Sequence, residues 1–139
     1  QFTMPGSPTI YYGDEAGQQG YEDPFNRRTY PWGNEDTEIL EFYKKLGNVR
    51  SNSKALNKGQ LRFLEADNDI LIYERQIEDE QMLILVNRGY ETVCYAVENA
   101  NEIVPVIGQP EIFIDENELQ SIALELQKAY IVKIIKEDN

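Results

Sequence analysis

Two pairs of charged side chains near the start of the chain have types and spacings that carbohydrate chemistry uses. Asp14 and Glu15 are adjacent, and Asp23 and Arg27 lie four residues apart in "DPFNR". Cleavage of a glycosidic bond uses two carboxylates about 5–9.5 Å apart, on opposite sides of the bond. Neighbours at the end of a strand point in opposite directions, so a structural role is favoured for Asp14 and Glu15.

Asp23 and Arg27 suit binding better than cleavage. A carboxylate accepts hydrogen bonds and a guanidinium donates them, so together they can hold several sugar hydroxyls. The alternative, in which the two side chains pair with each other and fix the loop, stays equally open. Tyr11, Tyr12 and Trp32 could present flat faces to a sugar ring, although Trp32 could equally pack the loop onto a core.

Composition excludes several other chemistries. The chain of 139 residues has 13 basic and 25 acidic side chains, hence a formal charge of −12, which disfavours nucleic acid and anionic membranes as partners. It has no histidine, which removes Ser-His-Asp catalysis and the usual zinc sites. We expect no metal site and no cofactor. The one cysteine, Cys94, lies in the alternating stretch "TVCYAV" and is predicted to be a buried structural thiol.

The elements that must position these residues follow from the apolar pattern. "TIYY" predicts a short strand at 9–12, and a long loop follows, whose aromatic side chains argue against disorder. One apolar face predicts a helix over 37–51, with Asp36 or Thr37 as its N-cap. Short strands separated by acidic or Gly-containing turns then predict an antiparallel sandwich. Those strands are "QLRFLEA", "ILIYERQI", "MLILVN", "TVCYAV", "EIVPVI", "EIFID", "SIALEL" and "AYIVKII".

Residues 4–33 carry a resemblance to a known family. "MPGSPTIYYGDEAGQQGYEDPFNRRTYPWG" resembles the eighth barrel strand and following loop of the alpha-amylase family of glycoside hydrolases, in its neopullulanase, cyclomaltodextrinase and oligo-1,6-glucosidase branches. The helix resembles the last helix of the barrel, and "KGQLRFLEADNDILIYER" the entry to the sandwich that follows it. The family's closing "LPPYGFxVL" is only echoed by "LQKAYIVKI", without its prolines.

The resemblance implies a fold and a division of labour. The expected fold is mainly β: a C-terminal antiparallel Greek-key β-sandwich (53–139), preceded by the last strand, loop and helix of a (β/α)₈ barrel (1–52). A complete barrel needs about 250 residues, so we expect the C-terminal part of a longer retaining α-glucan hydrolase. No catalytic residue is assigned here. The resemblance implies that Asp23 and Arg27 contact a glucose, with Tyr11 and Tyr12 near the floor of the site.

Three functional hypotheses follow. The preferred one is a hydrolase of α-1,4 or α-1,6 glucans, maltooligosaccharides or cyclodextrins, in which this chain alone is inactive. The second is a stand-alone carbohydrate-binding or protein-interaction module, for which Tyr90, Tyr95, Phe113 and Tyr130 are candidates, although core or strand-pair positions are favoured for them. The third is a purely structural cap on the barrel. A cytoplasmic location is expected by resemblance, and a homodimer is left open.

Overall fold

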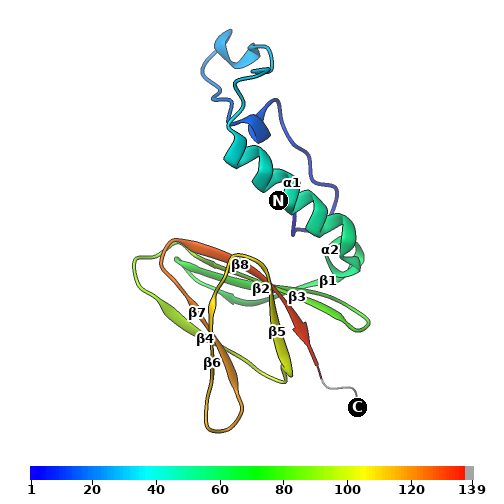
Figure 1. Ribbon diagram of the computed structural model, residues 1–139, viewed down its shortest axis with the longest axis vertical. Helices are drawn as coiled ribbons and strands as arrows, with labels where there is room; N and C mark the ends of the chain where they lie inside the picture. The colour runs from blue at the N-terminus through cyan, green and yellow to red at the C-terminus, as the bar shows by residue number, and fades with distance from the viewer. Residues whose placement is uncertain (137–139) are drawn as a thin grey trace.

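The computed structural model describes residues 1–136, so the last three residues of the predicted sandwich lie outside the described part. An N-terminal segment and a long loop precede two helices, α1 (Thr37–Asn52) and α2 (Lys54–Lys58). Eight strands follow: β1 (Gln60–Ala66), β2 (Ile70–Ile77), β3 (Glu80–Asn87), β4 (Val93–Val97), β5 (Glu102–Ile107), β6 (Glu111–Ile114), β7 (Gln120–Leu124) and β8 (Lys128–Ile135). Figure 1 shows α1 rising from the sheets with the loop at its far end.

The strands form two antiparallel sheets, which confirms the mainly β sandwich. One sheet has the order β1-β2-β3-β8-β5 and the other the order β4-β7-β6. β8 lies between β3 and β5, so the chain crosses from sheet to sheet rather than running as a simple meander. Each strand expected from the alternating pattern is present, with ends shifted by at most two residues.

Two apolar cores lie on the two faces of the larger sheet. Between the sheets, Ile72, Leu85, Ile122, Leu124 and Val132 are completely buried. On the other face, Ala55 and Leu56 of α2 pack against residues of β2, β3, β5 and β8: Tyr73, Met82, Ile84, Ile107 and Ile131. β3 is therefore covered on both sides, as its continuous apolar run predicts.

The N-terminal segment is held against the helices and the larger sheet by two buried arginines. Arg50 donates to the backbone carbonyls of Phe2, Met4 and Gly6, and Arg75 donates to those of Thr3 and Gly59. Arg75 is only 1% exposed, and neither arginine forms an ion pair with a carboxylate of residues 1–136. Burial, and then the nearby Arg50 guanidinium, lower the pKa of Arg75. The carbonyl oxygens take the place of a counter-charge.

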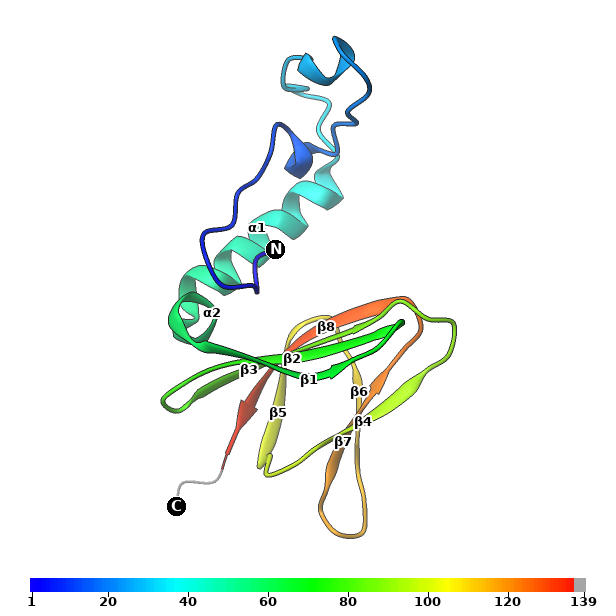
Figure 2. The same ribbon diagram turned by 180° about the vertical axis from the view of Figure 1, so that it is seen from behind.

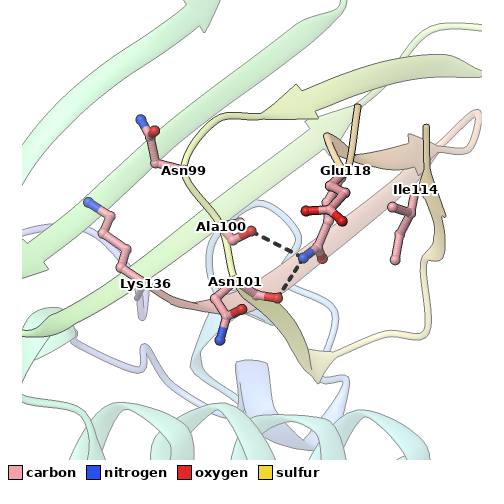
Figure 3. Close-up of a pocket in the computed structure, with 7 residues that line it drawn as sticks. Asn99, Ala100, Asn101, Ile114, Glu118 and Lys136 are labelled. Carbon is pink, nitrogen blue, oxygen red and sulfur yellow. Dashed lines mark hydrogen bonds between the residues drawn. The ribbon is translucent and has the colours of Figure 1, made fainter. Parts of the chain in front are cut away.

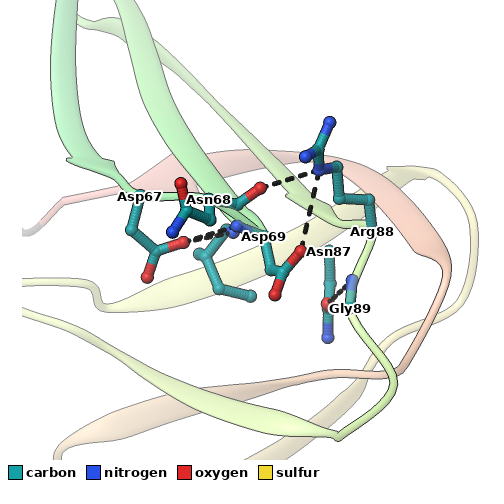
Figure 4. A network of polar contacts seen from close by, with 7 residues as sticks. Asp67, Asn68, Asp69, Asn87, Arg88 and Gly89 are labelled. Atoms are coloured by element: carbon teal, nitrogen blue, oxygen red, sulfur yellow. Dashed lines mark hydrogen bonds and ion pairs between the residues drawn. The ribbon is translucent and has the colours of Figure 1, made fainter.

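Asn87, the last residue of β3, connects the two sheets. Its side-chain amide donates to the carbonyls of Glu91 and of Leu124 in β7, and its oxygen accepts from the N–H of Gly89. Figure 4 shows this residue beside the β1–β2 turn, where Arg88 forms an ion pair of 3.7 Å with Asp69. The turn itself is fixed by Asp67, whose carboxylate accepts from two following backbone N–H groups, and these bonds lower its pKa.

Two expectations about local structure are wrong, and one helix is not predicted. Residues 9–12 are not a strand, because no neighbouring strand is present to pair with their backbone groups. The helix that is not predicted is α2, because five residues are too few to show a helical period. Cys94 is exposed, not buried, because the twofold alternation of β4 turns its side chain to the outer face of the smaller sheet.

Candidate functional site

The long loop is closed at its base by α1. The backbone N–H of Asp36 donates to the carbonyl of Ala16 at 3.0 Å, and the Asp36 carboxylate accepts from Glu38 and Ile39 as the helix N-cap. Gly17 has φ +71°, and a Cβ there would come within 2.9 Å of the Asp36 side chain. A glycine is therefore required for this close approach. The closure places residues 17–35 beyond the end of the helix, away from the sandwich (Figures 1 and 2).

Asp23 and Arg27 are brought together at the outer end of this loop. Arg27 Nε lies 3.2 Å from Asp23 Oδ1, and the two side chains remain 76% and 64% exposed, Arg27 first. The short 3₁₀ turn Phe25–Arg27 sets their spacing. The alternative in which they pair with each other is thus the state in this structure. Because an exposed pair contributes little to stability, both side chains stay available to exchange partners.

Tyr11 and Tyr12 lie in the N-terminal segment, just before the loop begins. Their ring centroids are 6.0 Å apart, and Tyr11 is 73% exposed. The Tyr12 hydroxyl donates to the carbonyl of Arg28, and the Gln18 amide reaches the same carbonyl at 3.5 Å. These hydrogen bonds therefore connect the segment that carries the two tyrosines to the part of the loop that carries Asp23 and Arg27.

Asp14 and Glu15 belong to a 3₁₀ turn, Asp14–Ala16, and not to the end of a strand. Asp14 is exposed, whereas Glu15 is half-buried and its Oε2 accepts no hydrogen bond from the described residues. Burial, and then the carboxylates of Glu15 and Glu35, raise the pKa of Tyr30. Tyr30 packs against Trp32 at 4.6 Å between ring centroids, yet Trp32 remains 80% exposed.

A hollow of about 590 Å³ lies beside the Asp23–Arg27 pair. Tyr21, Glu22, Asp23, Phe25 and Arg28 line it. From the sequence alone, Tyr21 and Phe25 indicate only an ordered loop, and Arg28 does not stand out. Two aromatic residues four positions apart, followed by two adjacent arginines, in "YEDPFNRR" are the signal that could have found them.

The sandwich has a cavity of its own, of about 630 Å³, at one end of the two sheets (Figure 3). It is lined by Asn99, Ala100, Asn101, Ile114, Glu118, Gln120 and Lys136. The Gln120 amide already donates to the carbonyls of Ala100 and Asn101. No aromatic ring lines this cavity, so it lacks the flat face that sugar binding would use.

The four aromatic candidates on the sandwich separate by exposure. Tyr130 is 4% exposed and belongs to the core, as favoured, and Tyr95 is half-buried against the same core. Phe113 faces outward from β6 at 44% exposure, opposite Ser121. Tyr90 is 83% exposed in a turn, so a core or strand-pair position is wrong for it. Neither Phe113 nor Tyr90 lines the sandwich cavity or the hollow beside Asp23 and Arg27.

The side chains of residues 1–136 form no group of three or more acids and cysteines that could hold a metal ion. Within the same residues, no helix is long and apolar enough to cross a membrane.

Together, these elements define a two-sheet antiparallel domain preceded by a helix that carries a polar, aromatic-rich loop. The model of the maltogenic amylase C-terminal domain matches residues 61–131. The chain belongs to this family, which confirms the resemblance to alpha-amylase family enzymes.

Relatives of known activity agree with this assignment. The chain is 42% identical over 100 residues to an amylopullulanase of Thermoanaerobacter thermohydrosulfuricus, covering 64% of this chain and 7% of that protein. It is 30% identical over 135 residues to a cyclomaltodextrinase of Thermoanaerobacter pseudethanolicus, covering 96% of this chain and 23% of that protein. An Anoxybacillus alpha-amylase structure superposes with a TM-score of 0.86 at 25% identity, over 99% of this chain and 31% of that one. The chain thus spans less than a third of each of these relatives.

Proposed function

We propose that this chain is the C-terminal part of an enzyme that hydrolyses α-1,4 or α-1,6 bonds in glucans, maltooligosaccharides or cyclodextrins. In the family that the chain resembles, three catalytic carboxylates follow the fourth, fifth and seventh barrel strands. The residues of this chain match none of those positions, so the chain alone is inactive. Residues 1–52 contribute one wall of the substrate site, and residues from 53 onward form the sandwich domain that stabilises it.

The observation that carries the proposal is the exposed Asp23–Arg27 pair, set between aromatic side chains at the end of a closed loop. An exposed ion pair has little structural value, whereas a carboxylate and a guanidinium at this spacing can exchange their mutual contact for sugar hydroxyls. Asp14 and Glu15 are adjacent on a single 3₁₀ turn, an arrangement unlike two carboxylates that flank a bond from opposite sides.

The experiment compares this chain with the full polypeptide that contains it. Both are purified and assayed for release of reducing sugar from pullulan, β-cyclodextrin and maltotriose. We expect hydrolysis by the full polypeptide and none by the 139-residue chain. In the full polypeptide, Asp23→Asn and Arg27→Gln should raise KM more than they lower kcat, because these residues bind and do not react. Hydrolysis by the isolated chain would contradict the proposal.

The remaining parts of the proposal concern location and assembly. The exposed free thiol of Cys94 suits a reducing compartment, which supports a cytoplasmic location. The formal charge of −12 supports neutral sugars, and not nucleic acid or anionic membrane, as partners. Fractionation with an antibody against the sandwich tests the location, and analytical ultracentrifugation of the full polypeptide tests for a homodimer.

A further inference from the structure

Three side chains beside the Asp23–Arg27 pair form a compact surface, here called the aromatic platform: Tyr21, Phe25 and Arg28. The Arg28 guanidinium carbon lies 5.5 Å from the Tyr21 ring centroid and 5.8 Å from that of Phe25. Both rings are 57% exposed, and all three residues line the hollow of about 590 Å³. The platform therefore borders open space instead of filling a core.

Hydrogen bonds to neighbouring residues hold the platform in place. The Arg28 carbonyl accepts from the Tyr12 hydroxyl, and the Tyr21 hydroxyl donates to Gln19 at 2.9 Å. Arg28 forms no ion pair with the carboxylates of residues 1–136, so the two rings are its partners. A guanidinium that rests near ring faces is held by cation–π attraction and keeps its outward N–H groups free to donate.

The chemistry of the hollow favours a neutral ligand with many hydroxyls. Glu22 and Asp23 line it together with Arg28, so acceptors and donors of hydrogen bonds stand beside ring faces. An anion would meet the carboxylates and the net charge of −12, and a cation would meet Arg28. A sugar ring satisfies both sides, because its C–H face carries a partial positive charge that suits the aromatic face, and its rim carries hydroxyls.

We propose that the aromatic platform binds a second glucose unit of an α-glucan chain, next to the unit held by Asp23 and Arg27. The inference rests on the proposed function, because it takes the Asp23–Arg27 pair as a sugar contact. It adds a consequence that the pair alone does not give: affinity depends on chain length. A single glucose reaches only one of the two positions, whereas a longer glucan occupies both.

The test is a titration of the isotopically labelled 139-residue chain with glucose, maltose, maltotriose and maltohexaose, followed by NMR. We expect affinity to increase with length, and shifts in the side-chain signals of Tyr21 and Phe25 only with the longer sugars. Phe25→Ala should weaken maltohexaose binding about three- to tenfold and leave glucose binding unchanged, as expected for the loss of one ring contact. Phe25→Trp should retain or strengthen maltohexaose binding.

Two controls separate the platform from the pair and from nonspecific stacking. Asp23→Asn should weaken glucose and maltohexaose alike, because it removes a contact common to both. Tyr90→Ala removes an even more exposed ring on the sandwich (83%, against 57% for Tyr21 and Phe25) and should change neither affinity. Unchanged amide shifts of α1 and the sheets would show that each variant is folded, and Tyr21→Ala provides a second platform variant.

The outcomes distinguish this inference from the function on which it rests. If both Phe25→Ala and Tyr21→Ala bound maltohexaose with the wild-type affinity, the platform would be overturned. Weaker binding by Asp23→Asn in the same experiment would still support Asp23 and Arg27 as a sugar contact. Absence of binding by the wild-type chain at about 50 mM sugar, a concentration at which even a weak ligand occupies its site, would also overturn the platform. The hydrolysis assay on the full polypeptide would still decide the proposed function independently.

Discussion

Asn87 shows how much a single buried amide can contribute to a two-sheet domain. It is 2% exposed, and its three hydrogen bonds connect β3, the following turn and β7. The neighbouring Arg88 also makes polar contacts, but its side chain is 75% exposed and its ion pair spans 3.7 Å. Burial, and not the number of contacts, distinguishes the two residues.

Replacement of Asn87 by Ala should therefore be far more costly than replacement of Arg88. We expect Asn87→Ala to lower the free energy of unfolding by about 2–4 kcal/mol, because it leaves buried carbonyls and an N–H without partners. Arg88→Ala should lower it by about 1 kcal/mol or less. Urea denaturation followed by circular dichroism measures both values, and equal losses would contradict the account.

Tyr130 should make stability depend on alkaline pH. Burial, and then its hydrogen bond to Glu125, raise the pKa of Tyr130 to about 12. The unfolded chain releases this proton near pH 10, so the stabilisation is complete below pH 10 and is lost as pH rises to 12. The free energy of unfolding of the wild type should fall by about 2 kcal/mol more than that of Tyr130→Phe between pH 9 and 12. Parallel pH profiles would exclude this role.

At the scale of elements, the sequence predicts what repeats and misses what is short or unpaired. The strands are predictable because alternation over five to eight residues identifies a half-buried sheet, and α1 because its apolar face extends over four turns. α2 has five residues, too few for a period. The 9–12 segment has the composition of a strand, but strands need partners, which composition does not report.

The site shows the same limit. The spacing in "DPFNR" correctly brings Asp23 and Arg27 into contact, because four residues around a turn return the chain on itself. The roles of Arg50 and Arg75 could not be predicted, because they donate to backbone carbonyls as far as 48 and 72 residues away in sequence, respectively. Those acceptors carry no side-chain signature, so a sequence pattern cannot reveal the contact.

The junction between the loop and α1 depends on Asp36. Asp36→Ala removes the two N-cap hydrogen bonds and should cost about 1 kcal/mol of stability. Asp36→Asn should restore most of this loss, because the amide oxygen accepts the same bonds. Thr37→Ala, one position along, is the control. Hydrogen exchange at residues 37–39 measures the effect locally, and unchanged protection in Asp36→Ala would contradict the capping role.

At the scale of the whole molecule, the candidate site and the sandwich lie at opposite ends of α1 (Figure 2). The N-terminal segment is the second connection between them, because it runs beside the helix and is bound at its start by Arg50 and Arg75. Phe2 packs edge-to-face on Tyr43 of α1, and the Thr3 hydroxyl lies 2.6 Å from that of Tyr73 in β2. The loop is thus joined to the sandwich both through α1 and through the N-terminal segment.

Loss of Arg75 should release this second connection. Arg75→Met leaves the carbonyls of Thr3 and Gly59 without donors in a buried place, and we expect a loss of about 2–4 kcal/mol. Limited proteolysis should then cut residues 1–12 faster than in the wild type. Lys128→Met, on the exposed side of β8, is the matched control. Equal cleavage rates in both variants would show that the segment is held by other contacts.

Arg50 binds the N-terminal segment through main-chain carbonyl oxygens. This binding therefore does not depend on the identity of the side chains along the segment. At Met4, whose side chain is 38% exposed, we expect substitutions to be tolerated provided that the path of the backbone is conserved. Gly6 differs, because its φ of +94° restricts the residues that can replace it. We therefore expect homologues to vary at position 4 and to retain glycine at position 6, because the path of the backbone is what must be kept, and not the side-chain surface.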